Sequence, residues 1–177
     1  MEILKIIIIV LLSLVSLLLM LALFLPKNYT ISSSIVINKN KKEVFDYVKI
    51  IKNQENYSVW VMEDPNSKKE YIGVDGTIGF ISKWESLNKN VGVGEQEIIN
   101  IIDGERIDID LRFKKPFEGN QKAANIFKEI SQNSTEVTNE FYGYNKYPTN
   151  IGVFFIKKIL KKTMDQNMQN LKNILEE

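Results

Sequence analysis

A single apolar segment near the N-terminus constrains this chain more than any other feature. From Ile6 to Leu25 no residue carries a charge, and the only polar side chains are Ser13 and Ser16. About twenty helical residues, each rising roughly 1.5 Å, span the ~30 Å hydrocarbon core of a bilayer. The segment therefore predicts a transmembrane helix, with residues 1–27 as an anchor and residues 28–177 as one domain outside the bilayer.

A cleaved signal peptide is the main alternative to a retained anchor. Signal peptides have shorter apolar cores and carry small residues at alternating positions before the cleavage site. Here the segment ends in Leu21–Leu25 (LALFL), where large residues occupy those positions. A buried core helix is a third interpretation, but such a helix would show amphipathic breaks. Basic residues lie on both sides of the segment, so the side of the membrane that the domain occupies stays open.

The chain contains no cysteine and no histidine. This composition excludes a lipoprotein anchor, Ser-His-Asp or Cys-His catalysis, and zinc sites with thiolate or imidazole ligands. We predict no metal and no cofactor, and any general acid or base would be Asp, Glu, Lys or Tyr. The formal net charge is +1, with both signs interleaved and no long basic stripe, so a nucleic-acid partner is not expected.

Hydrophobic periodicity downstream of the anchor predicts an α+β domain. A β-branched strand over 29–37 leads into a helix over 41–51, in which Val44, Phe45 and Val48 fall at helical spacing. A polar break over 53–56 precedes a short helical piece with Tyr57 and Trp60. Further strands are predicted over 70–73, 76–85, 92–102, 105–113, 121–130 and 135–144, followed by a long helix over 149–177.

Two of these elements indicate how the domain buries its apolar surface. In the strand over 105–113, one face carries Ile107, Ile109, Leu111 and Phe113, and the other carries Arg106, Asp108, Asp110 and Arg112. The last helix has an apolar stripe made of Ile156, Leu160, Met164, Met168, Leu171 and Leu175. A strongly curved antiparallel sheet needs such a helix in its concave face, and a cavity is expected where the two do not meet.

Motifs spread over the whole domain point to a known family. They are SIVINKNKKEVFDYV (34–48), the aromatic stretch ending at Trp60, Asp64-Pro65, Tyr71-Ile72-Gly73, Phe80, Trp84, GVGEQEI (92–98), GERIDIDLRFKKPF (104–117) and the terminal LKNILEE. This pattern resembles the START-like, or SRPBCC, superfamily, in particular its polyketide cyclase and dehydrase group. The resemblance implies a helix-grip fold, in which a curved antiparallel sheet of six to seven strands wraps around a long C-terminal helix. Members usually carry a tryptophan on the last strand, where this chain has Phe141.

Eight residues are candidates for the wall of the predicted cavity. The aromatic candidates are Trp60, Tyr71, Phe80, Trp84, Phe141 and Phe154, and Met164 and Asn139 complete the set. The alternative is that the apolar members are ordinary core side chains and that Asn139 bonds the backbone near an edge. A cluster of four lysines, Lys157, Lys158, Lys161 and Lys162, is either a solvated helix face or a contact for anionic headgroups.

Three functions remain open on the sequence alone. The first is a membrane-anchored domain that binds a lipid or another small hydrophobic molecule in the cavity. The second is an enzyme of the cyclase kind, which would need an ionisable residue with a shifted pKa inside the cavity. The third is an interaction scaffold whose cavity is filled by its own side chains. No catalytic residue, ligand identity or oligomeric state is predicted.

Overall fold

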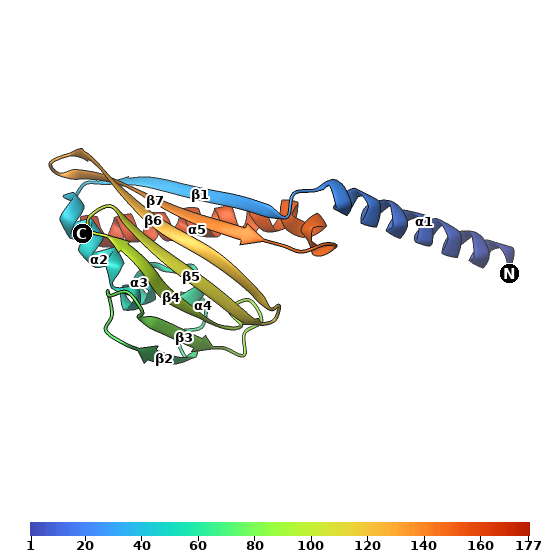
Figure 1. The fold of residues 1–177 in the computed structure, drawn as a ribbon, viewed down its shortest axis with the longest axis horizontal. Coiled ribbons are helices and arrows are strands. Elements are labelled where there is room, and N and C mark those ends of the chain that lie inside the picture. Colours follow the sequence, from blue (N-terminus) through green and yellow to red (C-terminus); the bar gives the residue numbers. More distant parts are fainter.

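The computed structural model describes residues 1–177 and shows a long N-terminal helix projecting from an α+β domain (Figure 1). Helix α1 (Glu2–Phe24) is long and apolar enough to cross a membrane, although a signal sequence passes the same test. A core helix would be covered by other elements, whereas Ala22 is the only buried residue of α1. Exposure of the remaining apolar residues therefore argues against a core helix.

The end of α1 is tied to the domain by one buried side chain. The Asn150 amide donates hydrogen bonds to the backbone oxygens of Ala22 at 2.7 Å and of Leu25 at 3.0 Å. These carbonyl groups belong to the last turn of the helix and lack helical donors of their own. Although Asn150 is remote from α1 in the sequence, it thus caps the C-terminal end of this helix. It thereby fixes the point at which the helix leaves the domain.

Seven antiparallel strands form one sheet in the order β1-β7-β6-β5-β4-β3-β2. Their bounds are β1 Asn28–Ile37, β2 Lys68–Ile72, β3 Ile81–Glu85, β4 Val93–Ile102, β5 Arg106–Lys115, β6 Gly119–Ser131 and β7 Ser134–Tyr144. The helical segments are α2 Lys41–Lys49, η1 Ile51–Asn53, α3 Gln54–Tyr57, α4 Val59–Glu63, η2 Thr149–Gly152 and α5 Val153–Glu176. The predicted fold class, a curved antiparallel sheet with a long C-terminal helix, is confirmed.

The main core lies where α2 and the second half of α5 pack on the sheet. It contains 15 buried side chains, with Phe45 from α2, Leu171 from α5 and Phe127 from β6 among them. The rings of Phe45 and Phe127 meet edge to face with centroids 5.2 Å apart. Burial of these side chains fixes the end of the sheet that lies away from α1 (Figure 1).

Local composition misled the sequence prediction at two places. The polar residues over 53–56 form η1 and α3 rather than a break, and the amide groups of Gln54 and Gln96 hydrogen-bond each other. The predicted strand over 76–85 begins only at Ile81, because Gly76 and Gly79 take positive φ and form a turn. Ile78 is exposed in this turn.

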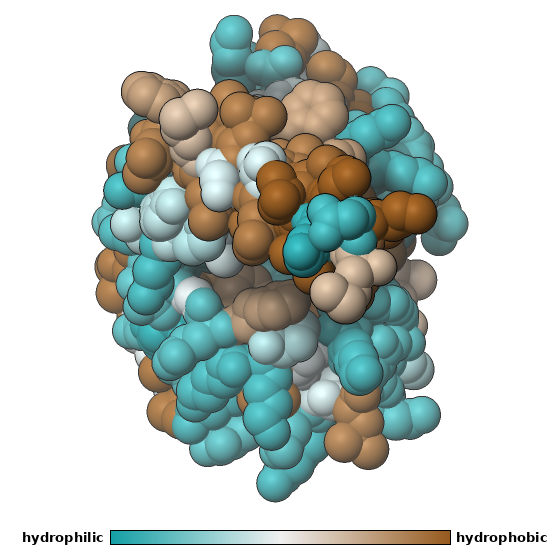
Figure 2. All heavy atoms as spheres, turned by 90° about the vertical axis from the view of Figure 1, so that its right-hand side faces the viewer, coloured by the Kyte–Doolittle hydropathy of each residue, from teal (hydrophilic) through white to brown (hydrophobic).

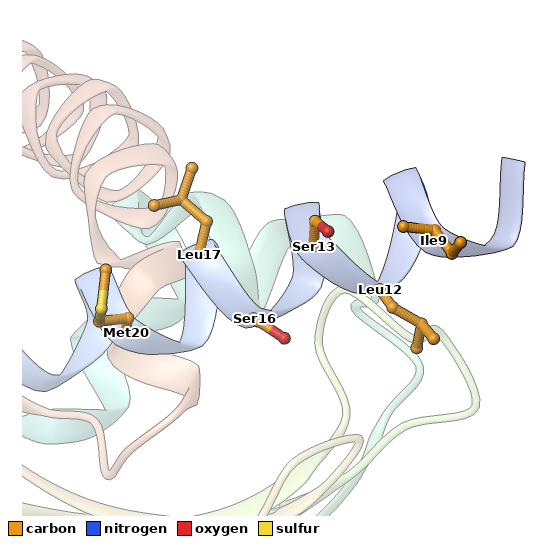
Figure 3. A pocket seen from close by; sticks show the side chains of 6 residues that line it. All are labelled: Ile9, Leu12, Ser13, Ser16, Leu17 and Met20. Atoms are coloured by element: carbon orange, nitrogen blue, oxygen red, sulfur yellow. The ribbon is translucent and has the colours of Figure 1, made fainter. Parts of the chain in front are cut away.

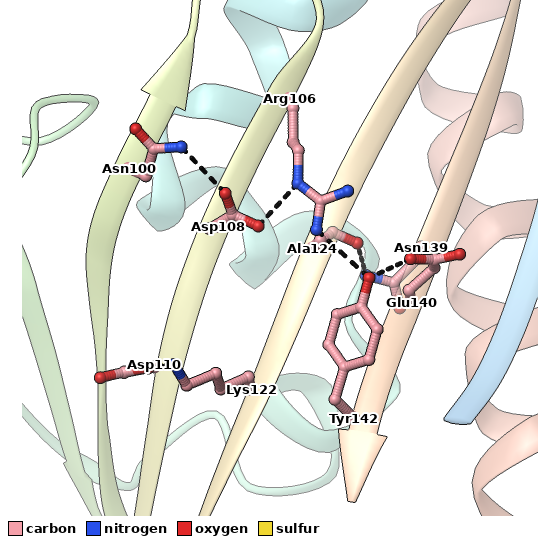
Figure 4. A network of polar contacts seen from close by, with 9 residues as sticks. All are labelled: Asn100, Arg106, Asp108, Asp110, Lys122, Ala124, Asn139, Glu140 and Tyr142. Atoms are coloured by element: carbon pink, nitrogen blue, oxygen red, sulfur yellow. Dashed lines mark hydrogen bonds and ion pairs between the residues drawn. The ribbon is translucent and has the colours of Figure 1, made fainter. Parts of the chain in front are cut away.

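The outer face of the sheet carries the charged residues that alternate with the core positions. Arg106 bonds Asp108 at 2.8 Å and the Tyr142 hydroxyl at 3.2 Å, and Tyr142 in turn donates to Glu140 (Figure 4). Farther along β5, Arg112 bonds Glu95 and Glu97 of β4, each at 2.7 Å. Asp108 and Asp110 therefore belong to an ion-paired surface, as the strand pattern indicated.

We expect the Arg112 pair to make the stability of the domain depend on pH. The hydrogen bond from Arg112 lowers the pKa of Glu95 below its ordinary value of 4.5. A carboxyl group of this kind stabilises the fold above its ordinary pKa and loses that contribution as the pH falls through the lowered pKa. Acid titration of the unfolding free energy should therefore show a loss of about 1 kcal/mol or less from this pair below pH 4.5.

The variant Glu95→Gln isolates this contribution, because it removes the carboxyl group and keeps the shape of the side chain. Its stability should depend less on pH in the acid range than that of the unmodified protein. Glu129→Gln is the matched control, since Glu129 is exposed and forms no ion pair or side-chain hydrogen bond. If the stability of Glu95→Gln and that of Glu129→Gln depend equally on pH in the acid range, the Arg112 pair with Glu95 is not the cause of the acid-dependent loss.

Candidate ligand-binding site

The inner faces of β5, β6 and β7 become more exposed toward the end from which α1 leaves. Along β5, Ile107 and Ile109 are buried, whereas Leu111 and Phe113 are only partly buried. The same change occurs along β7, from buried Val137 to partly exposed Asn139 and Phe141, and along β6, from Phe127 to Ala123. Because all of these side chains lie on the inner face, the gradient marks an interior that is packed at one end and partly exposed at the other.

A second, smaller apolar cluster borders the open end. It joins Tyr29 and Ile31 of β1 to Val153 and Met164 of α5, and Trp60, Phe141 and Leu160 pack against it. The Tyr29 ring lies flat over Gly143, where an added Cβ would come within 2.1 Å of the ring. Glycine is therefore required at this position of β7 for the aromatic ring to cover the strand.

Polar side chains separate the two apolar clusters on the inner face. Asn139 pairs with Ser33 across β1 and β7, and its amide donates to the Asn125 side chain at 2.9 Å. The same amide donates to the backbone oxygen of Ala124 at 3.4 Å, as the alternative interpretation of Asn139 predicts. The Ser33 hydroxyl bonds the Asp165 carboxylate of α5 at 2.5 Å. These groups lie where the open part of the interior begins, so a ligand there would meet hydrogen-bonding groups at its inner end.

The structure brings together only part of the predicted site. Trp60, Phe141 and Met164 meet around the small cluster, and Asn139 lies at its inner border. The prediction that Phe154 lines the cavity is wrong, because this side chain is 78% exposed on the outside of α5. The apolar stripe also differs from the prediction, since Ile156 is exposed and the buried face of α5 begins with Val153 instead.

The other predicted aromatic residues lie away from the open end or at its edge. Phe80 is buried in the main core and stacks on Tyr71 with centroids 6.1 Å apart. Trp84 covers Gly94, meets Phe113 edge to face and donates from its indole to the Val91 backbone at 3.2 Å. Of these three, Trp84 alone reaches a side chain of the partly exposed inner face.

Sequence reasoning missed several residues of this inner face. Leu111 and Phe113 were interpreted as strand core, and Ala123 and Gln96 were not considered. The signal was present in the strand alternation, because inward positions of β4, β5 and β6 can be read directly from it. The alternation does not show how far along each strand the packed core extends.

Shifted pKa values inside the domain give no group suited to proton transfer near neutral pH. Burial, together with the hydrogen bond to Glu55, raises the pKa of Tyr71 to about 12. Burial alone would raise the pKa of Asp165, but hydrogen bonds from Lys161 and Ser33 lower it overall. Near neutral pH both groups therefore keep their ordinary protonation states, so the Tyr71 hydroxyl is neutral and the Asp165 carboxyl group is ionised.

Two surface hollows lie away from the predicted cavity. A groove of about 520 Å³ runs along α1, where Ser13 and Ser16 lie between larger apolar side chains (Figure 3). A second hollow of about 510 Å³ lies at the ends of β1, β6 and β7, mostly on the outer face, and is rich in polar side chains. The candidate site is thus an open inner surface, in contrast to the enclosed cavity that was expected.

Comparison with known proteins supports the fold and leaves the chemistry open. No protein-family model matches the chain, and no curated protein matches it in sequence. Among solved structures, the di-domain ARO/CYC BexL from the BE-7585A biosynthetic pathway is 12% identical, with a TM-score of 0.62 over 85% of this chain and 51% of that chain. This chain therefore corresponds to about half of BexL.

Two further structures match this chain over most of their own length. Norcoclaurine synthase from Thalictrum flavum, solved with dopamine and hydroxybenzaldehyde, is 9% identical, with a TM-score of 0.62 over 84% of this chain and 86% of that chain. Protein MLL2253 from Mesorhizobium loti is 13% identical, with a TM-score of 0.61 over 83% and 96%. Identities this low establish the architecture alone. The chain has the helix-grip fold of these proteins, with α1 added in front of it.

Proposed function

We propose that this protein is a membrane-anchored binding domain that holds an amphipathic small molecule or lipid between its sheet and the first half of α5. The observation that carries the proposal is the gradient of exposure along the inner face. Apolar walls such as Phe113 and Phe141 are left partly uncovered at the open end, and Asn139 lies at the inner border. Uncovered apolar surface beside a few polar groups is typical of ligand sites.

The alternative functions have less support from the arrangement of the interior. A scaffold with a filled core would bury the inner face along its whole length, whereas Phe113, Asn139 and Phe141 stay partly exposed beside the two packed clusters. An enzyme would need a proton donor or acceptor near neutrality, and neither Tyr71 nor Asp165 is shifted in that direction. The helix-grip structure solved with dopamine and hydroxybenzaldehyde supports binding of small molecules by this architecture.

Filling the open part of the interior is expected to abolish ligand binding. Ala123 pairs with Phe141 on β7 and with Ile109 on β5, so the variant Ala123→Trp places an indole within the proposed site. Native mass spectrometry of the full chain, released from detergent micelles after incubation with host lipid extract, measures the bound fraction. We expect a lipid-like mass on the unmodified protein and a drop of about ten-fold or more in Ala123→Trp, equivalent to roughly 1.4 kcal/mol.

Lys122→Trp is the matched control, because it places the same side chain on the exposed outer face of the same strand. This variant should bind as the unmodified protein does. A mass that persists in Ala123→Trp would come from lipid held elsewhere, for example along α1, and would contradict the proposed site. Unmodified protein that stays free of any bound mass would contradict the proposed function.

A further inference from the structure

Every exposed aromatic side chain of this protein lies at one end of the domain. The six are Phe24, Phe117, Tyr144, Tyr147, Phe154 and Phe155. Phe24 ends α1, and Phe154 and Phe155 begin α5 directly after the segment that caps α1. The other twelve aromatic side chains are buried or partly buried. Exposed aromatic residues are thus confined to the surroundings of the anchor.

The strand register explains why residues far apart in sequence gather there. Asn28 pairs with Tyr144, so the start of β1 and the end of β7 lie together beside α1. The turn between β5 and β6, which carries Phe117, lies at the same end because Lys122 of β6 pairs with Tyr142 near the end of β7. Figure 2 views this end and shows apolar side chains gathered around the projecting helix.

Positive charge surrounds these aromatic residues. Within three positions of them in sequence lie Lys27, Lys114, Lys115, Lys146, Lys157 and Lys158, whereas Glu118 is the single acidic residue in those windows. The chain as a whole has a formal net charge of only +1, so the excess of lysine is local. Aromatic side chains together with lysines are the combination found at the interface between a membrane and water.

We propose that this end of the domain docks on anionic phospholipid headgroups of the leaflet in which α1 ends, with Phe117, Phe154 and Phe155 entering the interface. The proposal rests on the membrane anchoring that the proposed function assumes. Asn150 supports it independently, because its hydrogen bonds to Ala22 and Leu25 hold the start of α5 against the end of α1. The open end of the candidate site then faces the lipid, and an amphipathic ligand enters it from the bilayer.

Site-directed spin labelling tests the docking directly, because the chain has no cysteine of its own. Single cysteines replace Leu12 in the middle of α1, Phe155 at the start of α5, and Gln169 about 21 Å farther along α5. The full chain is reconstituted in nanodiscs of phosphatidylcholine with or without phosphatidylglycerol. Accessibility of each label to oxygen, which concentrates in lipid, is compared with accessibility to a water-soluble nickel complex.

We expect lipid-like accessibility at positions 12 and 155 on anionic discs, and water-like accessibility at position 169. The double variant Lys157→Gln/Lys158→Gln should lower the docked-to-undocked ratio at position 155 by roughly ten- to thirty-fold on anionic discs. Lys41→Gln/Lys128→Gln is the matched control at the opposite end of the domain and should leave the ratio unchanged. Neither lysine of the control forms an ion pair.

The possible outcomes separate the two proposals. A lipid-like label at position 12 with a water-like label at position 155 would overturn the docking and leave the anchor intact. Water-like labels at both positions would overturn the anchor and the docking together. Docking that is equal on neutral and anionic discs would overturn the role assigned to the lysines.

Discussion

Replacing Leu171 by alanine is expected to remove roughly 2–5 kcal/mol from the free energy of unfolding of the domain. Leu171 is fully buried in the core that joins α5 to the sheet and α2. The truncation leaves a cavity among side chains that are held by three separate elements and cannot readily close around it. Urea unfolding of the full chain in detergent micelles measures the loss, with the fluorescence of Trp60 and Trp84 as the signal.

Leu87→Ala makes the same chemical change at a fully exposed residue between β3 and β4. Its effect should stay within about 0.5 kcal/mol, because no packed neighbour loses contact. Comparable destabilisation in the two variants would mean that α5 is not held by the core described above. A loss of stability in Leu171→Ala alone would show that this buried contact holds α5 to the sheet and α2.

Gly143→Ala is expected to cost about 1–3 kcal/mol, although it adds only one methyl group. The new Cβ would lie 2.1 Å from the Tyr29 ring, which is buried against Val153 and Met164. The ring cannot keep both its present place and ordinary contact distances, so the small cluster must open. The same urea titration measures this loss, and the fluorescence of Trp60, which packs on the cluster, should change in the folded state.

Gly119→Ala serves as the control for this substitution on the neighbouring strand. The nearest atom to its new Cβ is the end of the flexible Gln121 side chain at 3.4 Å, so the cost should be small. In a Tyr29→Leu background, Gly143→Ala should also become much less costly, because the clashing ring is absent. If the cost of Gly143→Ala is the same with and without the ring, the proposed clash is not its cause.

Local patterns in the sequence were sufficient to predict most of the architecture. Alternation along 105–113 identified the inner and outer faces of β5, because successive side chains of a strand point to opposite sides. The same reasoning did not predict the turn that glycine residues form. The run from Gly76 to Phe80 has the composition of a strand, yet two glycines with positive φ turn it back on itself. Residue preference alone does not distinguish these outcomes.

The candidate site was harder to predict because it depends on contacts between distant segments. Leu111 and Ile107 have the same position in the strand pattern, yet only Ile107 is buried, since α5 and α2 cover one end of the sheet. The prediction that Phe154 lines the cavity was wrong for a related reason. It is exposed, whereas its neighbour Val153 in the same turn of α5 packs on Tyr29 of β1, so the two side chains lie on different faces of the helix. Exposure in both cases is set by tertiary packing.

The route by which the chain enters the domain has a mechanical consequence. Only Leu25, Pro26 and Lys27 separate α1 from β1, and α1 leaves at the same end at which β1 begins (Figure 1). A pull on α1 is therefore transmitted along the axis of β1, whose ten residues are all paired with β7. Because such a pull acts parallel to the strands, it loads the hydrogen bonds between β1 and β7 in shear. All of these hydrogen bonds then resist separation of the two strands at the same time. A force applied at α1 would thus be shared by the hydrogen bonds of the whole β1–β7 ladder.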